Sequence, residues 1–159
     1  MPPDPKLDIL IRPARPDDLP AVVEIESVSF PSPWGQDVYR PELARAEARF
    51  RVAAVEAEVV GYVLAWAVYD EAFILKIATR PELRRRGVAG ALLAALADEL
   101  KSKAVGSLWL EVRARNRTAR RFYRALGFVE MGVRKKYYSD TGDDAVTMAL
   151  ALAPQDEGG

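Results

Sequence analysis

The sequence of 159 residues contains no cysteine and no histidine. These absences exclude disulfide bonds, a thiol nucleophile, a histidine base and the usual zinc ligands, so we expect no metal site. No apolar run approaches the roughly 20 residues needed to span a bilayer. The start, residues 1–6, does not resemble a signal peptide. Proton transfer must therefore fall to Asp, Glu, Tyr, Lys or backbone groups, and we predict a cytoplasmic protein.

The chain also lacks an excess of either charge, because 23 basic and 23 acidic residues give a net charge of zero. This balance argues against a general nucleic-acid or membrane binder. Half of the residues are apolar and 29% are charged, which is typical of a globular protein. The length predicts a single domain over residues 7–152, with flexible ends at 1–6 and 153–159. The sequence does not fix the oligomeric state, and a monomer is compatible with it.

Apolar periodicity and turn residues predict one order of strands and helices. Strands are predicted at 7–13, 50–55, 59–68, 73–79, 108–113, 128–134 and 145–150. Helices are predicted after a cap at Asp17 or Asp18, and at 36–48, 88–103 and 116–127. This order indicates an α/β fold with a sheet of mixed direction and parallel crossovers around the two later helices.

A turn rich in arginine and glycine precedes the helix at 88–103. It reads Arg84, Arg85, Arg86, Gly87, Val88, Ala89, Gly90. The first N–H groups of a helix lack partners within it and lie at the positive end of its dipole, so they favour an anion. Gly87 lets the backbone approach a phosphate closely. The turn therefore favours a phosphate site, although the same residues can simply start a helix beside solvated arginines.

A second candidate site lies on the strand at 108–113, where Glu111 shares one face with Trp109 and Arg113. A carboxylate beside an indole on a central strand is partly desolvated, which suits a general base. The alternative is an exposed edge-strand glutamate paired with Arg113. Tyr123, on the helix at 116–127, can supply a proton or simply pack in the core. Asn116 can cap that helix.

Together these pieces resemble the GNAT superfamily of N-acetyltransferases, whose Gln/Arg-x-x-Gly-x-Gly/Ala signature is matched by Arg84, Gly87 and Ala89. Within it, further segments are similar to the bacterial RimI-type N-alpha-acetyltransferases of ribosomal proteins. These segments are residues 30–34, 77–81, 108–116 and 122–128, and the ending with 134–138, 143–145 and 148–150.

The resemblance implies a GNAT fold, a mixed and mostly antiparallel sheet of about seven strands with about four helices, whose splayed central parallel strands hold acetyl-CoA. The resemblance also implies catalytic and binding roles for individual residues. Glu111 would be the general base and Tyr123 the acid that protonates the CoA thiolate. The cofactor contacts would be Ile77, Ala78, Thr79, Arg84, Arg85, Arg86, Gly87, Val88, Ala89, Gly90, Asn116 and Tyr123. Phe30, Trp34, Tyr137 and Tyr138 would flank the peptide acceptor.

By this resemblance the acceptor would be the N-terminal amine of a protein, first of all an N-terminal alanine of small-subunit ribosomal protein eighteen. Two alternatives remain. One is an acetyltransferase for lysine side chains, polyamines or another small amine, drawn by acids such as Glu24, Glu26, Asp70 and Glu71. The other is a non-catalytic acetyl-CoA-binding module. The chain departs from the family pattern at Lys76, where a neutral polar residue is expected, and by one extra residue in the loop 30–34.

Overall fold

The computed structural model describes residues 7–152, so the predicted flexible ends lie outside the described residues. Seven strands form one sheet in the order β1-β2-β3-β4-β5-β7-β6. The strands are β1 (Leu10–Pro13), β2 (Ala48–Val55), β3 (Glu58–Val68), β4 (Glu71–Thr79), β5 (Ser107–Arg113), β6 (Val129–Tyr138) and β7 (Asp143–Ala151). The helices are α1 (Leu19–Ser29), α2 (Gln36–Tyr39), α3 (Val88–Ser102) and α4 (Arg117–Ala125), with 3-10 turns at Pro16–Asp18, Arg40–Leu43 and Pro81–Leu83.

Strands β4 and β5 are parallel, whereas β1–β2, β2–β3, β5–β7 and β6–β7 are antiparallel. The predicted fold, a mixed and mostly antiparallel sheet of seven strands with four α-helices, is therefore confirmed. Among the described residues, no helix is long and apolar enough to cross a membrane.

The chain forms two compact units. The first comprises the residues up to Trp66 together with Leu75–Asp98, and the second comprises Ala67–Ile74 together with the residues from Glu99 onward. Each is described below by itself. The assignment of one domain to residues 7–152 stays a prediction.

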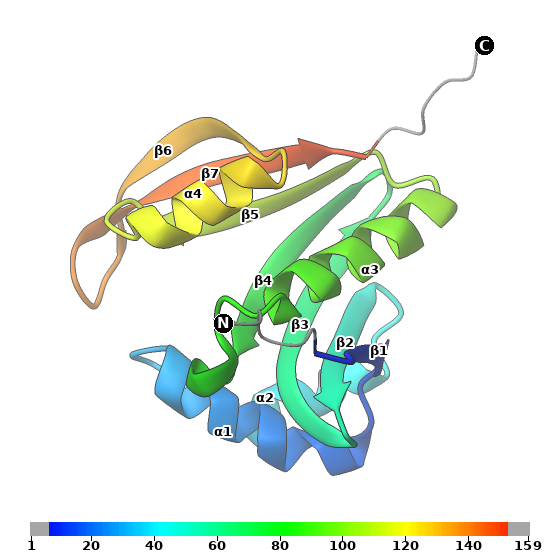
Figure 1. Ribbon diagram of the computed structural model, residues 1–159. Helices are drawn as coiled ribbons and strands as arrows, with labels where there is room; N and C mark the ends of the chain where they lie inside the picture. Colours follow the sequence, from blue (N-terminus) through cyan, green and yellow to red (C-terminus); the bar gives the residue numbers. More distant parts are fainter. Residues whose placement is uncertain (1–6, 153–159) are drawn as a thin grey trace, which may run out of the picture. The chain divides into compact units, whose positions relative to one another are not determined.

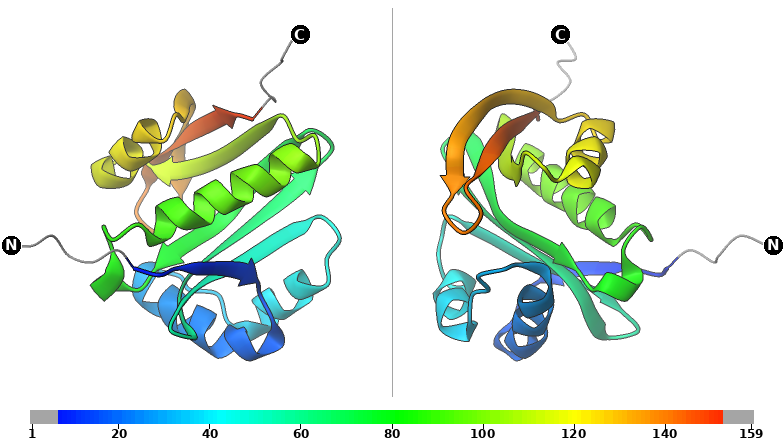
Figure 2. Two further views of the ribbon diagram at one scale, coloured as in Figure 1. Left: turned by 45° about the vertical axis from the view of Figure 1, so that its right-hand side comes forward. Right: turned by 90° about the vertical axis from the view of Figure 1, so that its left-hand side faces the viewer.

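In the first unit, helices cover both faces of β2 and β3 (Figure 2). Successive strand residues point to opposite faces. Tyr62 and Leu64 pack with Val22 and Ile25 of α1 in one buried cluster. On the other face, a Cβ atom at Gly61 would lie 2.8 Å from the Val88 side chain, so glycine is needed for α3 to approach the sheet.

In the second unit, α4 lies against the layer of β5, β7 and β6 (Figure 1). Leu108, Leu110 and Val112 of β5 are buried, and their partners on β7 include the buried Met148 and Val146. Arg120 and Arg124 of α4 both bond to Glu130 of β6. These exposed ion pairs therefore link α4 to β6 within its unit.

Two local predictions are wrong. The helix expected at 36–48 ends as an α-helix at Tyr39 and continues only as the 3-10 turn Arg40–Leu43. Pro41 lacks the N–H that an α-helix would use, which accounts for the break. Asp18 occupies the cap position of α1 but makes no capping bond. Its carboxylate instead binds Arg12 at 2.7 Å and the backbone N–H of Arg15 at 2.7 Å.

Candidate functional site

The arginine-glycine turn ends where α3 begins, as predicted, because Val88 is the first residue of the helix. Gly87 has φ +90°, a conformation that favours glycine, and its carbonyl accepts the N–H of Ala91 at 2.9 Å. A Cβ atom at Gly87 or Gly90 would meet no atom within 4 Å. The helix therefore starts in open space, with the N–H groups of its first turn available to an anion.

The strand residues predicted to pair with the cofactor, Ile77–Thr79, form the last part of β4. In the described part of the chain, β4 pairs with β5 through Glu71, Ala72 and Phe73. Ile77–Thr79 lies beyond them. Arg84 of the turn reaches back to this strand and donates from Nε to the carbonyl oxygen of Thr79 at 3.3 Å. The end of β4 and the turn are therefore joined in the first unit.

Glu111 lies on a central strand, because β5 stands between β4 and β7. The predicted alternative of an edge-strand pair with Arg113 is wrong, since Arg113 binds Asp140 at 2.8 Å. Glu111 instead meets Arg134 of β6, whose Nε lies 2.6 Å from Oε2, and accepts a bond from the Thr147 hydroxyl at 3.3 Å. Its side chain is 24% exposed, so the carboxylate is held in place yet reaches solvent.

The tyrosines of the predicted peptide site, Tyr137 and Tyr138, lie in the same network. The Arg134 guanidinium lies 5.3 Å from the centre of the Tyr137 ring, and that of Arg113 lies 4.0 Å from the centre of the Tyr138 ring. Burial raises the pKa of Tyr138, and the negative charge of Glu111 raises it further. In the second unit, Arg134 thus contacts both Glu111 and Tyr137, and Arg113 contacts Tyr138.

Tyr123 lies inside α4 and its ring contacts those of Phe122 and Phe128, at 5.3 and 5.6 Å between centres. Burial raises the pKa of its hydroxyl to about 12, so the phenol is protonated at neutral pH. Asn116 caps α4 as predicted, accepting the N–H of Ala119 at 3.1 Å. The assigned proton donor is therefore in the right protonation state, while its catalytic role and the cofactor contact of Asn116 stay predictions.

Sequence reasoning missed a buried polar cluster beneath the loop that holds Phe30 and Trp34. Its centre is Glu26 of α1, which is fully buried. The Glu26 carboxylate accepts bonds from the hydroxyls of Tyr39 and Tyr62 and from the backbone N–H of Trp34 at 3.0 Å. The Lys76 ammonium lies 2.9 Å from the same carboxylate. The departure from the family pattern at Lys76 thus has a structural role, because Lys76 neutralises Glu26.

Burial by itself raises the pKa of Glu26, but the bonds from Tyr39, Tyr62, the Trp34 N–H and Lys76 outweigh it and leave the pKa below its ordinary value. Glu26 is therefore ionised at neutral pH and is not the surface acid expected for attracting cationic acceptors. Glu24 is exposed, but it binds Arg80 at 2.7 Å.

The sequence carries a signal for this pair. Glu26 follows Leu19, Val22 and Val23 at the spacing of one helix face, and Lys76 interrupts the apolar run 73–78. A charged residue on an apolar face needs a partner of opposite charge. Arg134 gives no comparable signal, because its strand is exposed along almost its whole length.

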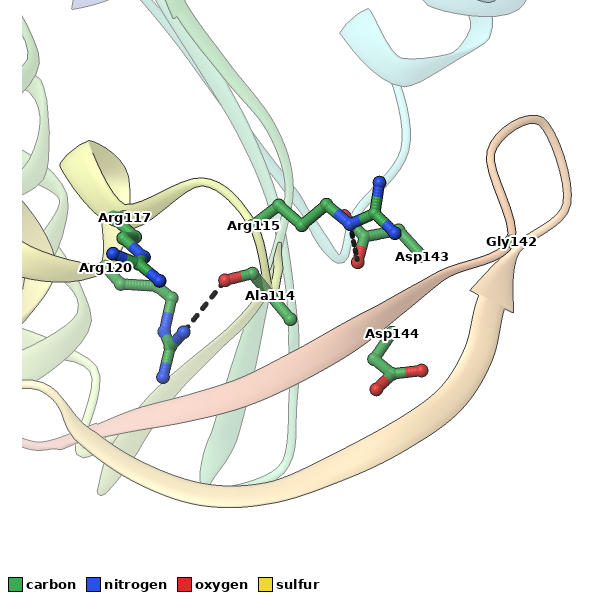
Figure 3. A pocket seen from close by; sticks show the side chains of 7 residues that line it. All are labelled: Ala114, Arg115, Arg117, Arg120, Gly142, Asp143 and Asp144. Atoms are coloured by element: carbon green, nitrogen blue, oxygen red, sulfur yellow. Dashed lines mark hydrogen bonds and ion pairs between the residues drawn. The ribbon is translucent and has the colours of Figure 1, made fainter.

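The second unit also contains an open hollow beside the start of α4 (Figure 3). It is lined by Ala114, Arg115, Arg117, Arg120, Gly142, Asp143 and Asp144. Arg120 donates to the Ala114 carbonyl oxygen at 2.8 Å, and Arg115 approaches Asp143 at 3.9 Å (Figure 3). None of the predicted site residues lines this hollow, so it adds nothing to the predicted chemistry.

Comparison with known proteins places these features in a family. The profile described as "Acetyltransferase (GNAT) family" matches residues 19–128. The chain is 36% identical over 138 residues to ribosomal protein bS18-alanine N-acetyltransferase of Escherichia coli strain K12, covering 86% of this chain and 93% of that one. It is 33% identical over 155 residues to an N-alpha-acetyltransferase of Sulfurisphaera tokodaii, covering 89% and 92%.

A solved structure shows the same likeness in three dimensions. The crystal structure of the ribosomal-protein-S18-alanine N-acetyltransferase from Escherichia coli matches with a TM-score of 0.85 and 33% identity, covering 94% of this chain and 97% of that one. The profile match spans more than half of the chain, and the relatives match it over almost their whole lengths. The chain therefore belongs to the GNAT family of acetyltransferases.

Proposed function

We propose that the protein transfers the acetyl group of acetyl-CoA to the N-terminal α-amine of a protein, and that an N-terminal alanine of ribosomal protein bS18 is the first acceptor to test. The observation that carries this proposal is the 36% identity with the Escherichia coli bS18-alanine N-acetyltransferase over almost the whole of both chains. The network of Glu111, Arg134 and the two tyrosines supports it, because these residues can hold a base beside an acceptor.

The residues of the first unit fit a CoA donor, which acetyltransferases of this family use. A diphosphate carries negative charge, and α3 starts in open space with the N–H groups of its first turn at the positive end of the helix dipole. The neighbouring turn supplies three arginines, Arg84–Arg86. In this proposal the turn holds the diphosphate, while the backbone of Ile77–Thr79 pairs with the pantetheine arm and Asn116 contacts the cofactor.

Ala89→Asp tests the turn, because it should move stability and affinity in opposite directions. An acid in the first turn of a helix stabilises it by about 0.3–1 kcal/mol. The same charge repels a diphosphate, so we expect the Kd for acetyl-CoA to rise by about tenfold or more. Calorimetric binding and thermal unfolding measure the two effects. Ala94→Asp, on an exposed position of the same helix, is the matched control and should leave the Kd unchanged.

The transfer needs a neutral amine, a polarised carbonyl and a protonated leaving group. In the proposed mechanism Glu111 accepts the proton of the attacking amine, through water. The backbone N–H of Ile77 or Ala78 donates a hydrogen bond to the thioester oxygen. Acetyl-CoA supplies the thioester, whose C–S bond breaks as the new C–N bond forms. Tyr123 donates its phenolic proton to the departing sulfur. No covalent enzyme intermediate is required, which suits a chain without cysteine or histidine.

Tyr123→Phe is expected to lower kcat by the same factor, about 10²-fold, at every pH from about 6 to 9. The reason is that burial raises the pKa of Tyr123 to about 12, so the phenol stays protonated across this range. A pH series of kcat for both proteins measures this. Tyr69→Phe, at a tyrosine that is 95% exposed, is the control. A wild-type rate that falls at alkaline pH, with a fall absent from Tyr123→Phe, would contradict the assigned protonation.

The acceptor class is tested with acetyl-CoA and a panel of unblocked N-terminal peptides, N-terminally blocked lysine peptides and polyamines. CoA release and product mass give the result. We expect turnover with the unblocked peptides, and most with those that begin with alanine. Acetylation of lysine side chains or polyamines alone would overturn the proposed acceptor. Acetyl-CoA binding without turnover on any amine would instead indicate a non-catalytic module.

A further inference from the structure

Lys76 combines three contacts in the first unit. Its ammonium lies 2.9 Å from the buried Glu26 carboxylate, 3.9 Å from the centre of the Phe30 ring and 4.6 Å from the centre of the Trp34 ring. Its side chain is 14% exposed. Lys76 also directly precedes Ile77–Thr79 on β4. It therefore lies beneath the loop assigned to the acceptor and next to the strand assigned to the donor.

These contacts fill a site that would otherwise suit a foreign cation. Two aromatic rings over a carboxylate are the components of a cage for an ammonium group. Lys76 occupies the faces of both rings and cancels the charge of Glu26. The surface at this loop consequently offers a second cation neither the ring faces that Lys76 covers nor an unpaired acid.

We infer that Lys76 determines acceptor specificity, by excluding polyamines and peptides whose first side chain is cationic from the loop of Phe30 and Trp34. The inference rests on the proposed function and on the sequence-based prediction that Phe30 and Trp34 flank the acceptor. Lys76 takes no part in the transfer of the acetyl group. It acts by covering the ring faces and by pairing with Glu26, so that no cation site is open, which raises the selectivity for a small neutral residue such as alanine.

The test compares kcat/KM for one peptide that begins with alanine and for the same peptide beginning with lysine, together with spermidine. Lys76→Met keeps an unbranched side chain, shorter by one atom, and removes the charge. We expect it to shift the ratio toward the cationic acceptors by about tenfold or more. Lys76→Arg keeps the charge and should keep the wild-type ratio. Lys103→Met, at an exposed lysine, is the matched control and should change nothing.

The double variant Glu26→Gln/Lys76→Met guards against failure of Lys76→Met to fold, because it leaves no buried charge behind. It uncovers the ring faces without exposing a carboxylate, so its ratio should lie between those of the wild type and of Lys76→Met. A wild-type ratio in both Lys76→Met and the double variant would overturn the inference, as would a cationic preference in Lys76→Arg.

A binding measurement separates this inference from the proposed function. Spermidine should bind saturably to Lys76→Met and quench its tryptophan fluorescence, because Trp34 then faces a vacant cation site, whereas the wild type should show no such binding. This result, combined with no transfer to any peptide, would uphold the role of Lys76 and overturn the proposed acceptor. Peptide acetylation by the wild type, together with no binding of spermidine to Lys76→Met, would uphold the proposed acceptor and overturn the role of Lys76.

Discussion

Glu111→Gln is expected to lower kcat by about 10²–10⁴-fold, the range that a positioned general base contributes. Glutamine keeps the shape of the side chain but cannot accept the proton of the amine. Its amide oxygen can still accept the bonds that Arg134 and Thr147 donate to Glu111. The loss should therefore appear in kcat, with the Kd for acetyl-CoA changed by less than about twofold. Steady-state kinetics and calorimetric binding give the two quantities.

Glu130→Gln is the control for this variant. It also removes a carboxylate paired with arginines of the second unit, here Arg120 at 2.9 Å and Arg124 at 3.1 Å, but it lies outside the proposed site. We expect its kcat to equal that of the wild type. Full activity in Glu111→Gln at the pH optimum would show that the assigned base is wrong. An equal loss in both variants would trace the effect to broken ion pairs.

Glu26→Ala is expected to lower the free energy of unfolding by about 3–5 kcal/mol, the cost of removing one partner of a buried ion pair. Lys76 would be left without its counterion, and the hydroxyls of Tyr39 and Tyr62 would lose their shared acceptor. Chemical denaturation followed by circular dichroism measures the change. Glu24→Ala is the control on the same helix, α1, and removes an exposed acid that pairs with Arg80. It should lower the free energy of unfolding by no more than about 1 kcal/mol.

The stability that Glu26 contributes should depend on pH in a definite direction. The pKa of Glu26 in the folded protein lies below its ordinary value of 4.5. The contribution is therefore complete above pH 4.5 and is lost as the pH falls through the folded pKa. The difference in unfolding free energy between wild type and Glu26→Ala should shrink only in acid below that value. A difference that instead shrinks between neutral pH and 4.5 would contradict the ionised, hydrogen-bonded state of Glu26.

Elements with strong local signals could be predicted from the sequence. The turn before α3 was predictable because Gly87 needs a positive φ and the apolar stripe of the helix begins at Val88. Asn116 and Gly127 likewise mark the start and end of α4, since one caps the helix and the other takes φ +104° beyond it. These features depend on residues that are close together in the chain.

The partners of the charged side chains could not be predicted, because they depend on register and on distant segments. Glu111 meets Arg134 instead of the neighbouring Arg113, since β6 pairs with β7 through shifts of register that strand alternation does not reveal. The position of Glu26 on the apolar face of its helix indicates that it needs a partner of opposite charge, but does not identify that partner. Its partner, Lys76, comes from a strand far along the chain. For both Glu111 and Glu26, contacts between segments that are distant in the sequence determine the partner.

The most direct test of acetyl transfer to a protein N-terminus uses one peptide that begins with alanine and carries an internal lysine. The peptide is incubated with the wild-type protein and acetyl-CoA, and fragmentation by mass spectrometry locates the acetyl group. The proposed function predicts acetylation of the alanine α-amine, with the lysine unmodified and the reaction lost in Glu111→Gln. Acetylation of the lysine alone, or an unmodified peptide despite acetyl-CoA binding, would contradict it.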